Sequence, residues 1–140
     1  MTAALVERLL QGRLGGQVSA PLSVSTPDLT LEQAYGLQRQ VEQSLVGRGD
    51  RVVGYKVGFT TAALQERHGL TEPVLGFILG SGVYGSGDAV PLSRFIAIGV
   101  EVEVAFLLKS DLAGPGGTIA SALLAVEGAL PSFELIDFRL

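Results

Sequence analysis

The period of the hydrophobic pattern changes along this chain, and this change constrains the fold more than any other feature. Before residue 70, apolar residues recur at helical spacing; Leu31, Ala34, Leu37 and Val41, for example, form one stripe. After residue 75, apolar residues alternate with polar ones or form short runs, as strands do. The sequence therefore predicts an α+β fold, with helices mostly in the first half and a strand-dominated core in the second.

Capping residues and glycines mark the boundaries of the expected elements. Thr30 and Gln33 have the spacing of a capping box, and threonine also precedes two later helical patterns. Glycine, which accounts for 19 of the 140 residues, closes most of the helical segments. We expect helices over residues 1–14, 30–46, 60–68 and 118–128, and strands over residues 51–59, 75–79, 94–108 and 131–140.

The composition excludes several classes of function. Hydrophobic residues make up 47% of the chain and charged residues 17%, which excludes disorder by composition. The absence of cysteine excludes disulfides, thiolate metal sites and a cysteine nucleophile, and a single histidine argues against a His-rich zinc site. A net charge of −4 without a basic run argues against nucleic-acid binding. Because no membrane-length apolar stretch or secretory signal is visible, a cytoplasmic location is expected.

Two glutamates share one face of an apolar strand pattern in residues 99–108, GVEVEVAFLL. Alternation directs Glu101 and Glu103 to one face, and it directs Val100, Val102 and Val104 to the other. Two carboxylates placed in this way repel each other unless a cation lies between them, and Mg²⁺ or Mn²⁺ prefers such oxygen ligands. A half-solvated strand with an acidic outer face is the commoner arrangement. The pair alone leaves both interpretations open.

Two further polar residues interrupt apolar, strand-like runs. Glu134, in PSFELIDF, either supplies a third carboxylate from a neighbouring strand or has a structural role. Nearby, Asp137 and Arg139 can form a structural ion pair. Lys56, in GYKVGFT, can serve as an acid, a base or an oxyanion partner if its amine lies in a partly dry pocket. Otherwise its aliphatic stem simply covers apolar surface.

Residues 80–85 match the G-x-G-x-x-G pattern of dinucleotide-binding loops. Such a loop must open a helix, and the turn-forming residues that follow, up to Pro91, cannot form one. We therefore predict a tight turn at this position. His68, at the end of a short helical pattern beside Gly69, is assigned no role as a ligand.

Taken in order, five segments of the chain resemble a known enzyme group. They are LTLEQAYGLQRQV, GYKVGFTTAALQERHGL, EPVLGFIL, the E-V-E strand and LPSFELID. They are similar to the 2-keto-4-pentenoate hydratases and 4-oxalocrotonate decarboxylases of the fumarylacetoacetate hydrolase superfamily. The resemblance implies that Glu101, Glu103 and Glu134 bind Mg²⁺ or Mn²⁺. It also implies that Lys56 is a catalytic acid/base on the substrate side, with its amine directed toward the carboxylates.

The resemblance further implies an activity, a substrate and a domain organisation. It implies a hydratase that adds water to 2-hydroxypenta-2,4-dienoate in aromatic meta-cleavage catabolism, acting on a small 2-oxo or 2-hydroxy-dienoic acid. A sister decarboxylase or C–C hydrolase is the alternative among enzymes, and a non-catalytic truncated remnant or partner subunit is the alternative outside them. Family members are longer, so we expect an N-terminal α/β segment at residues 1–85 and an incomplete first part of the β-rich catalytic core at 86–140. A homo-oligomer or a C-terminal partner chain is therefore expected.

Overall fold

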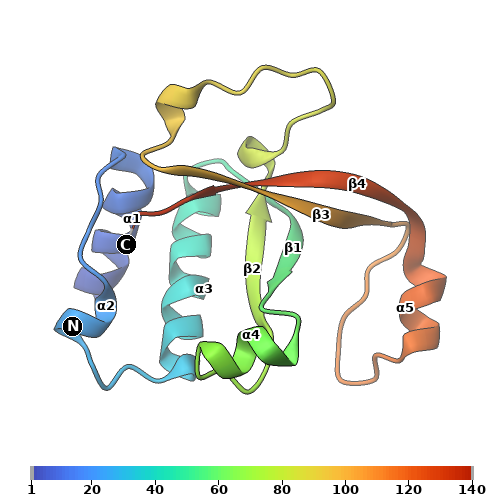
Figure 1. Ribbon diagram of the computed structural model, residues 1–140, viewed down its shortest axis with the longest axis horizontal. Coiled ribbons are helices and arrows are strands. Elements are labelled where there is room, and N and C mark those ends of the chain that lie inside the picture. The colour runs from blue at the N-terminus through green and yellow to red at the C-terminus, as the bar shows by residue number, and fades with distance from the viewer. Residues whose placement is uncertain (1, 140) are drawn as a thin grey trace. The chain divides into compact units, whose positions relative to one another are not determined.

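The structure is a computed structural model that describes residues 2–139, and the chain divides into two units. The first unit ends at Leu92 and the second spans Ser93–Arg139. Figure 1 labels the main helices and strands of both. In chain order the elements are α1 (Thr2–Gly15), α2 (Leu22–Ser25), α3 (Leu31–Gly47), β1 (Val52–Gly58), α4 (Ala62–Arg67), β2 (Val74–Leu79), the 3₁₀ turns η1 (Gly80–Gly82) and η2 (Leu92–Arg94), β3 (Ile98–Leu108), α5 (Ile119–Ala125) and β4 (Val126–Asp137).

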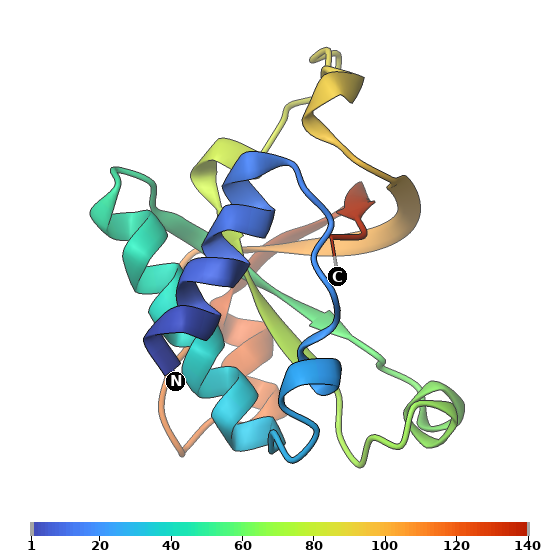
Figure 2. The same ribbon diagram turned by 90° about the vertical axis from the view of Figure 1, so that its left-hand side faces the viewer.

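Helices α1 and α3 lie side by side and supply most of the core of the first unit (Figures 1 and 2). On α3, Leu37, Val41 and Leu45 recur every fourth residue and form one buried stripe. Leu37 and Val41 belong to the stripe that the sequence predicts, whereas Leu31, at the start of that stripe, is exposed. The helix begins with the expected capping box. Thr30 Oγ1 accepts from the Gln33 amide at 3.2 Å, and the Gln33 side chain accepts from the Thr30 amide at 2.9 Å. The buried cluster comprises Val6, Leu10, Leu37, Val41, Leu45 and Leu79.

Strands β1 and β2 form an antiparallel pair in which Lys56 lies opposite Gly76. After β1 the chain passes through Phe59, which adopts the left-handed conformation at φ 54°. Gln65 Nε2 on α4 donates to the Phe59 carbonyl at 2.7 Å, and the Phe59 ring meets the His68 ring edge to face, with centroids 4.9 Å apart. His68 is thus a packing residue, in agreement with its position at the end of the helical pattern.

The second unit is built on the antiparallel pair β3 and β4, with α5 in the connection between them (Figure 1). The ladder runs from the Ile98–Asp137 pair to the Leu108–Val126 pair. The α+β prediction is confirmed, and the decisive segment, residues 100–108, is a strand as expected. None of the helices within residues 2–139 is both long and apolar enough to cross a membrane.

Several element boundaries differ from the sequence-based predictions. The strand expected from residue 94 begins at Ile98, because residues 92–94 form a 3₁₀ turn. The helix expected to reach about residue 128 ends at Ala125, and β4 starts at Val126 instead of Pro131. The reason for the second difference is tertiary, since Val126 and the residues after it pair with the end of β3. A short helix, α2, also forms in a stretch that we expected to contain only turns.

The tight turn predicted for the G-x-G-x-x-G match is present. Residues 80–82 form a single 3₁₀ turn directly after β2, and no helix follows them before residue 92. Asp50 holds this turn to the start of β1, because its carboxylate accepts from the Ser81 hydroxyl at 2.5 Å and from the Ser81 amide at 3.2 Å. The Ser81 hydroxyl bond and the bond from the Arg51 amide lower the pKa of the Asp50 carboxyl, outweighing the opposing effect of burial.

Candidate metal centre

The three glutamates predicted from the sequence lie together in the structure. Glu101, Glu103 and Glu134 each offer a carboxylate oxygen, and these oxygens all lie within 4.8 Å of one another. The arrangement follows from strand geometry. Glu101 and Glu103 are two positions apart on β3 and therefore share a face, and Glu134 lies directly opposite Glu101 on β4. Two strands therefore supply the three acidic groups.

The electrostatics of this cluster favour a bound cation. Glu101 is exposed, whereas Glu103 and Glu134 are half-buried. Like charges that face each other across two strands destabilise the pairing, and a cation that all three carboxylates share converts this repulsion into attraction. Carboxylate oxygen is the ligand that Mg²⁺, Ca²⁺ and Mn²⁺ prefer. The donor set therefore fits a hard divalent cation.

The spacing of the oxygens also fits such an ion. At Mg²⁺–oxygen distances of about 2.0–2.1 Å, two ligand oxygens on opposite sides of the ion are about 4.2 Å apart. Ca²⁺, at about 2.3–2.6 Å, allows separations up to about 5 Å. Three oxygens that are 4.8 Å apart leave their midpoint about 2.8 Å from each, so the glutamates reach Ca²⁺ with shifts of a few tenths of an ångström and Mg²⁺ with shifts of at most about 0.7 Å.

Lys56 lies in the middle of β1, in the first unit. Its side chain belongs to the half-buried face of the strand, whereas its neighbours Tyr55 and Val57 are exposed. The lysine stem passes over Gly76, since a Cβ atom at that position would lie only 3.1 Å from Lys56 Cγ. The glutamates belong to the second unit. The expectation that the lysine amine points toward them therefore stays a prediction.

An Asp–Arg pair near the end of β4 plays a larger part in the structure than the sequence suggested. Arg139 Nε donates to Asp137 Oδ2 at 2.5 Å, which is the ion pair expected from their spacing. Asp137 Oδ1 also accepts from the amides of Ile96 and Ala97, at 2.9 and 2.8 Å, and these contacts could not be predicted from the sequence pattern. Burial acts to raise the pKa of the Asp137 carboxyl, but the bonds from the two amides and from Arg139 outweigh it and lower that pKa.

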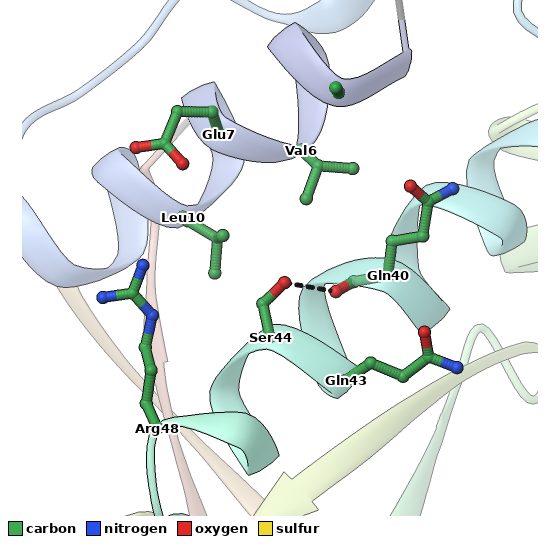
Figure 3. Close-up of a pocket in the computed structure, with 8 residues that line it drawn as sticks. Val6, Glu7, Leu10, Gln40, Gln43, Ser44 and Arg48 are labelled. Atoms are coloured by element: carbon green, nitrogen blue, oxygen red, sulfur yellow. Dashed lines mark hydrogen bonds between the residues drawn. The ribbon is translucent and has the colours of Figure 1, made fainter.

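An open groove lies between α1 and α3 (Figure 3). In it, the Ser44 hydroxyl donates to the Gln40 carbonyl of the same helix at 2.8 Å, so this polar group is already satisfied within α3. None of the predicted catalytic or metal-binding residues lines the groove, and we assign it no function. Its lining residues are Ala3, Val6, Glu7, Leu10, Gln40, Gln43, Ser44 and Arg48.

Comparison with known proteins relates the whole described fold to one group of enzymes. The chain matches no protein-family model. It is 36% identical over 137 residues to a 2-hydroxypent-2,4-dienoate hydratase of Pseudomonas putida, with 97% of this chain and 62% of the relative covered. It is 33% identical over 138 residues to a 2-keto-4-pentenoate hydratase of Burkholderia vietnamiensis, with coverage of 99% and 53%.

Solved structures agree with these relationships. The 4-oxalocrotonate decarboxylase of Pseudomonas putida G7, complexed with magnesium and adipate, superposes with a TM-score of 0.92 at 28% sequence identity, over 99% of this chain and 52% of that one. Over nearly its whole length, the chain is similar to 2-keto-4-pentenoate hydratases and 4-oxalocrotonate decarboxylases. A second structure of the same decarboxylase is complexed with calcium and acetate. The chain spans about half the length of the curated relatives that it matches.

Proposed function

We propose that the chain serves a metal-dependent hydratase that adds water to 2-hydroxypenta-2,4-dienoate in aromatic meta-cleavage catabolism. The observation that carries the proposal is the convergence of Glu101, Glu103 and Glu134 in a chain whose relatives include hydratases of 2-hydroxypent-2,4-dienoate and 2-keto-4-pentenoate. We propose Mg²⁺ or Mn²⁺ as the ion that these three residues hold. A magnesium ion in a complex of the related decarboxylase supports this choice.

The chemistry of the substrate suits this donor set. When bound, a divalent cation supplies Lewis-acid stabilisation of the negative charge on the substrate carboxylate and 2-oxygen. The three glutamates orient the ion, and thereby the acid end of the substrate. Lys56 moves a proton from the 2-hydroxyl to the far end of the conjugated system, which yields an unsaturated ketone, and water then adds to the remaining carbon–carbon double bond.

A decarboxylase is the second candidate. The superposition on a 4-oxalocrotonate decarboxylase, with a TM-score of 0.92, favours it. The three glutamates would hold the cation, and its Lewis-acid stabilisation of a 2-oxo or 2-hydroxy acid would serve either reaction, so the carboxylate cluster suits both. The products distinguish the two activities, because only the decarboxylase releases carbon dioxide. Incubation with each substrate, followed by product analysis with NMR, separates hydration from decarboxylation.

We also propose that the active species contains more than one chain. Val102 on β3 and Phe133 on β4 lie opposite each other and are 80% and 72% exposed. Apolar side chains that gather on one face in this way mark interaction surfaces. We favour a homo-oligomer, and light scattering of the purified chain tests it. Turnover that appears only when a separate C-terminal partner chain is added would instead identify that partner as the missing component.

The metal proposal is tested by titrating the chain with Mn²⁺ in a calorimeter. We expect one Mn²⁺ per chain for the wild type and a large loss of affinity in Glu103→Gln, which removes one charged ligand and keeps the side-chain shape. Glu127→Gln is the matched control, because Glu127 is exposed on β4 and lies outside the cluster. Equal Mn²⁺ affinities for the wild type and Glu103→Gln would contradict the assignment.

A further inference from the structure

The C-terminal end of β4 is fastened to the segment that leads into β3. Asp137 accepts two hydrogen bonds from the consecutive amides of Ile96 and Ala97. Arg139 donates to the same carboxylate through Nε and to the Arg94 carbonyl through Nη2, at 2.9 Å. Residues 94–97 precede β3, so the side chains of Asp137 and Arg139 tie this segment to β4 where the strand ladder does not yet extend. We refer to these two residues as the clamp.

The burial of this sheet does little to fix how its two strands align. Strand register is normally specified by a buried apolar face, and it is weakly specified in a sheet whose two faces both meet solvent. Here Val100, Val102 and Val104, on the apolar face of β3, are 60%, 80% and 63% exposed. The opposite face carries the glutamates, and Glu101 on it is exposed. In the single chain, before another chain covers the apolar face, burial therefore contributes little to selecting the register.

The position of the glutamates depends directly on that register. The clamp lies at the first ladder pair, Ile98–Asp137, and the Glu101–Glu134 pair follows three positions later along β3. A slip of one residue between two strands turns every side chain of the slipped strand to the other face. Such a slip would leave Glu134 facing valines of β3 and would disperse the three carboxylates.

We propose that Asp137 and Arg139 are positioning residues that hold β3 and β4 in the register that brings Glu101, Glu103 and Glu134 to one ion. The inference rests on the proposed function, because it concerns the same metal centre. The low exposure of the Asp137 side chain, 9%, agrees with a fixed structural contact. Both oxygens of its carboxylate accept hydrogen bonds at the clamp.

The clamp acts on the metal centre without belonging to it. Asp137 and Glu134 are an odd number of positions apart on β4, so the strand directs their side chains to opposite faces. Among the described residues, the acidic group whose oxygens lie within 4.8 Å of one another contains only the three glutamates. Replacement of Asp137 therefore leaves every proposed ligand in the chain and changes only how the ligands are held.

The test compares Mn²⁺ affinity in the full chain carrying Asp137→Ala or Asp137→Asn. Asparagine keeps an oxygen that can accept from the Ile96 and Ala97 amides, but its amide nitrogen cannot accept from Arg139. Loss of residues that orient metal ligands commonly costs about 10–100-fold in affinity. We expect a loss of about tenfold in Asp137→Ala and recovery of most of that loss in Asp137→Asn.

Two controls separate positioning from general destabilisation. Thr118→Ala removes the capping box of α5 in the same unit and leaves the ladder untouched, so it should lower thermal stability without changing Mn²⁺ affinity. Cross-strand NMR contacts of the Val102–Phe133 pair report the register directly, and we expect them to weaken in Asp137→Ala. Wild-type affinity together with wild-type contacts in Asp137→Ala would overturn the proposal. If the wild type binds no Mn²⁺, the metal proposal fails, whereas the cross-strand contacts still test the clamp.

Discussion

Replacing Gly76 with alanine tests how the Lys56 side chain is held on β1. The two residues lie opposite each other in the β1–β2 pair. A Cβ atom at position 76 would lie 3.1 Å from Lys56 Cγ and 3.7 Å from Lys56 Cδ. Favourable carbon–carbon contacts begin at about 3.5 Å, so the new methyl group would overlap the lysine stem by about 0.4 Å. The stem must then leave its present path.

The magnitude follows from a comparison with Gly54→Ala in the same strand pair. A Cβ at position 54 would lie 3.9 Å from Ile78 Cδ1, which is an ordinary contact. Neither glycine has a left-handed φ, so alanine at either site should stabilise the fold by about 0.4–1 kcal/mol through the unfolded chain. Overpacking, which costs about 1–3 kcal/mol, applies only at Gly76. Because a lysine stem can bend away, we expect Gly76→Ala to be less stable than Gly54→Ala by about 1 kcal/mol.

Two measurements check this expectation. Urea unfolding of both variants gives the difference in the free energy of unfolding. Reductive methylation with ¹³C-formaldehyde gives each lysine amine an NMR signal, and the chain has only two lysines, so Lys109 serves as an internal reference for Lys56. We expect the Lys56 signal to move in Gly76→Ala and to stay in place in Gly54→Ala. Equal stabilities and an unmoved Lys56 signal would refute the idea that Gly76 shapes the path of the lysine.

Two further predictions concern the first unit. Leu37 is 3% exposed in the core of α3, so Leu37→Ala should lower the free energy of unfolding by about 2–5 kcal/mol in urea titrations; a loss below 1 kcal/mol would contradict its placement. The lowered pKa of Asp50, caused chiefly by the Ser81 hydroxyl, means that the folded state favours the ionised form. The stability that this provides is present above the ordinary pKa of the carboxyl and is lost as the pH falls through the lowered value in the folded state. Asp50→Asn should flatten this acid-side loss in unfolding curves measured across pH, and an unchanged pH dependence would speak against the Ser81 bond.

Local sequence rules predicted those features of the fold that depend on near neighbours. The capping box of Thr30 and Gln33 and the buried stripe of α3 need only a few residues of chain, and both are present. The pairing of Glu101 with Glu103 on one face likewise follows from alternation alone. These features could be predicted because their physical cause lies within one element.

Features that depend on a distant partner could not be predicted in the same way. The strand-like run of the sequence placed the start of the last strand at Pro131. In the structure, pairing with β3 extends β4 back to Val126, because hydrogen bonding to a partner strand outweighs the local helical pattern. Alternation also could not place Glu134 opposite Glu101, since that depends on register. The residues left Glu134 as either a third carboxylate or a structural residue, and only the family resemblance favoured the first.

The order of the ligands along the chain has a consequence for how the centre assembles during folding. Glu101 and Glu103 are near neighbours on one strand, whereas Glu134 reaches them only after the chain has passed through the connection at residues 109–125. Closing such a loop costs conformational entropy before any contact between β3 and β4 repays it. A cation that needs all three carboxylates therefore meets a complete site only late in folding. The bound cation would therefore mainly slow the separation of β3 from β4 during unfolding. It would hardly change the rate at which the two strands first meet during folding.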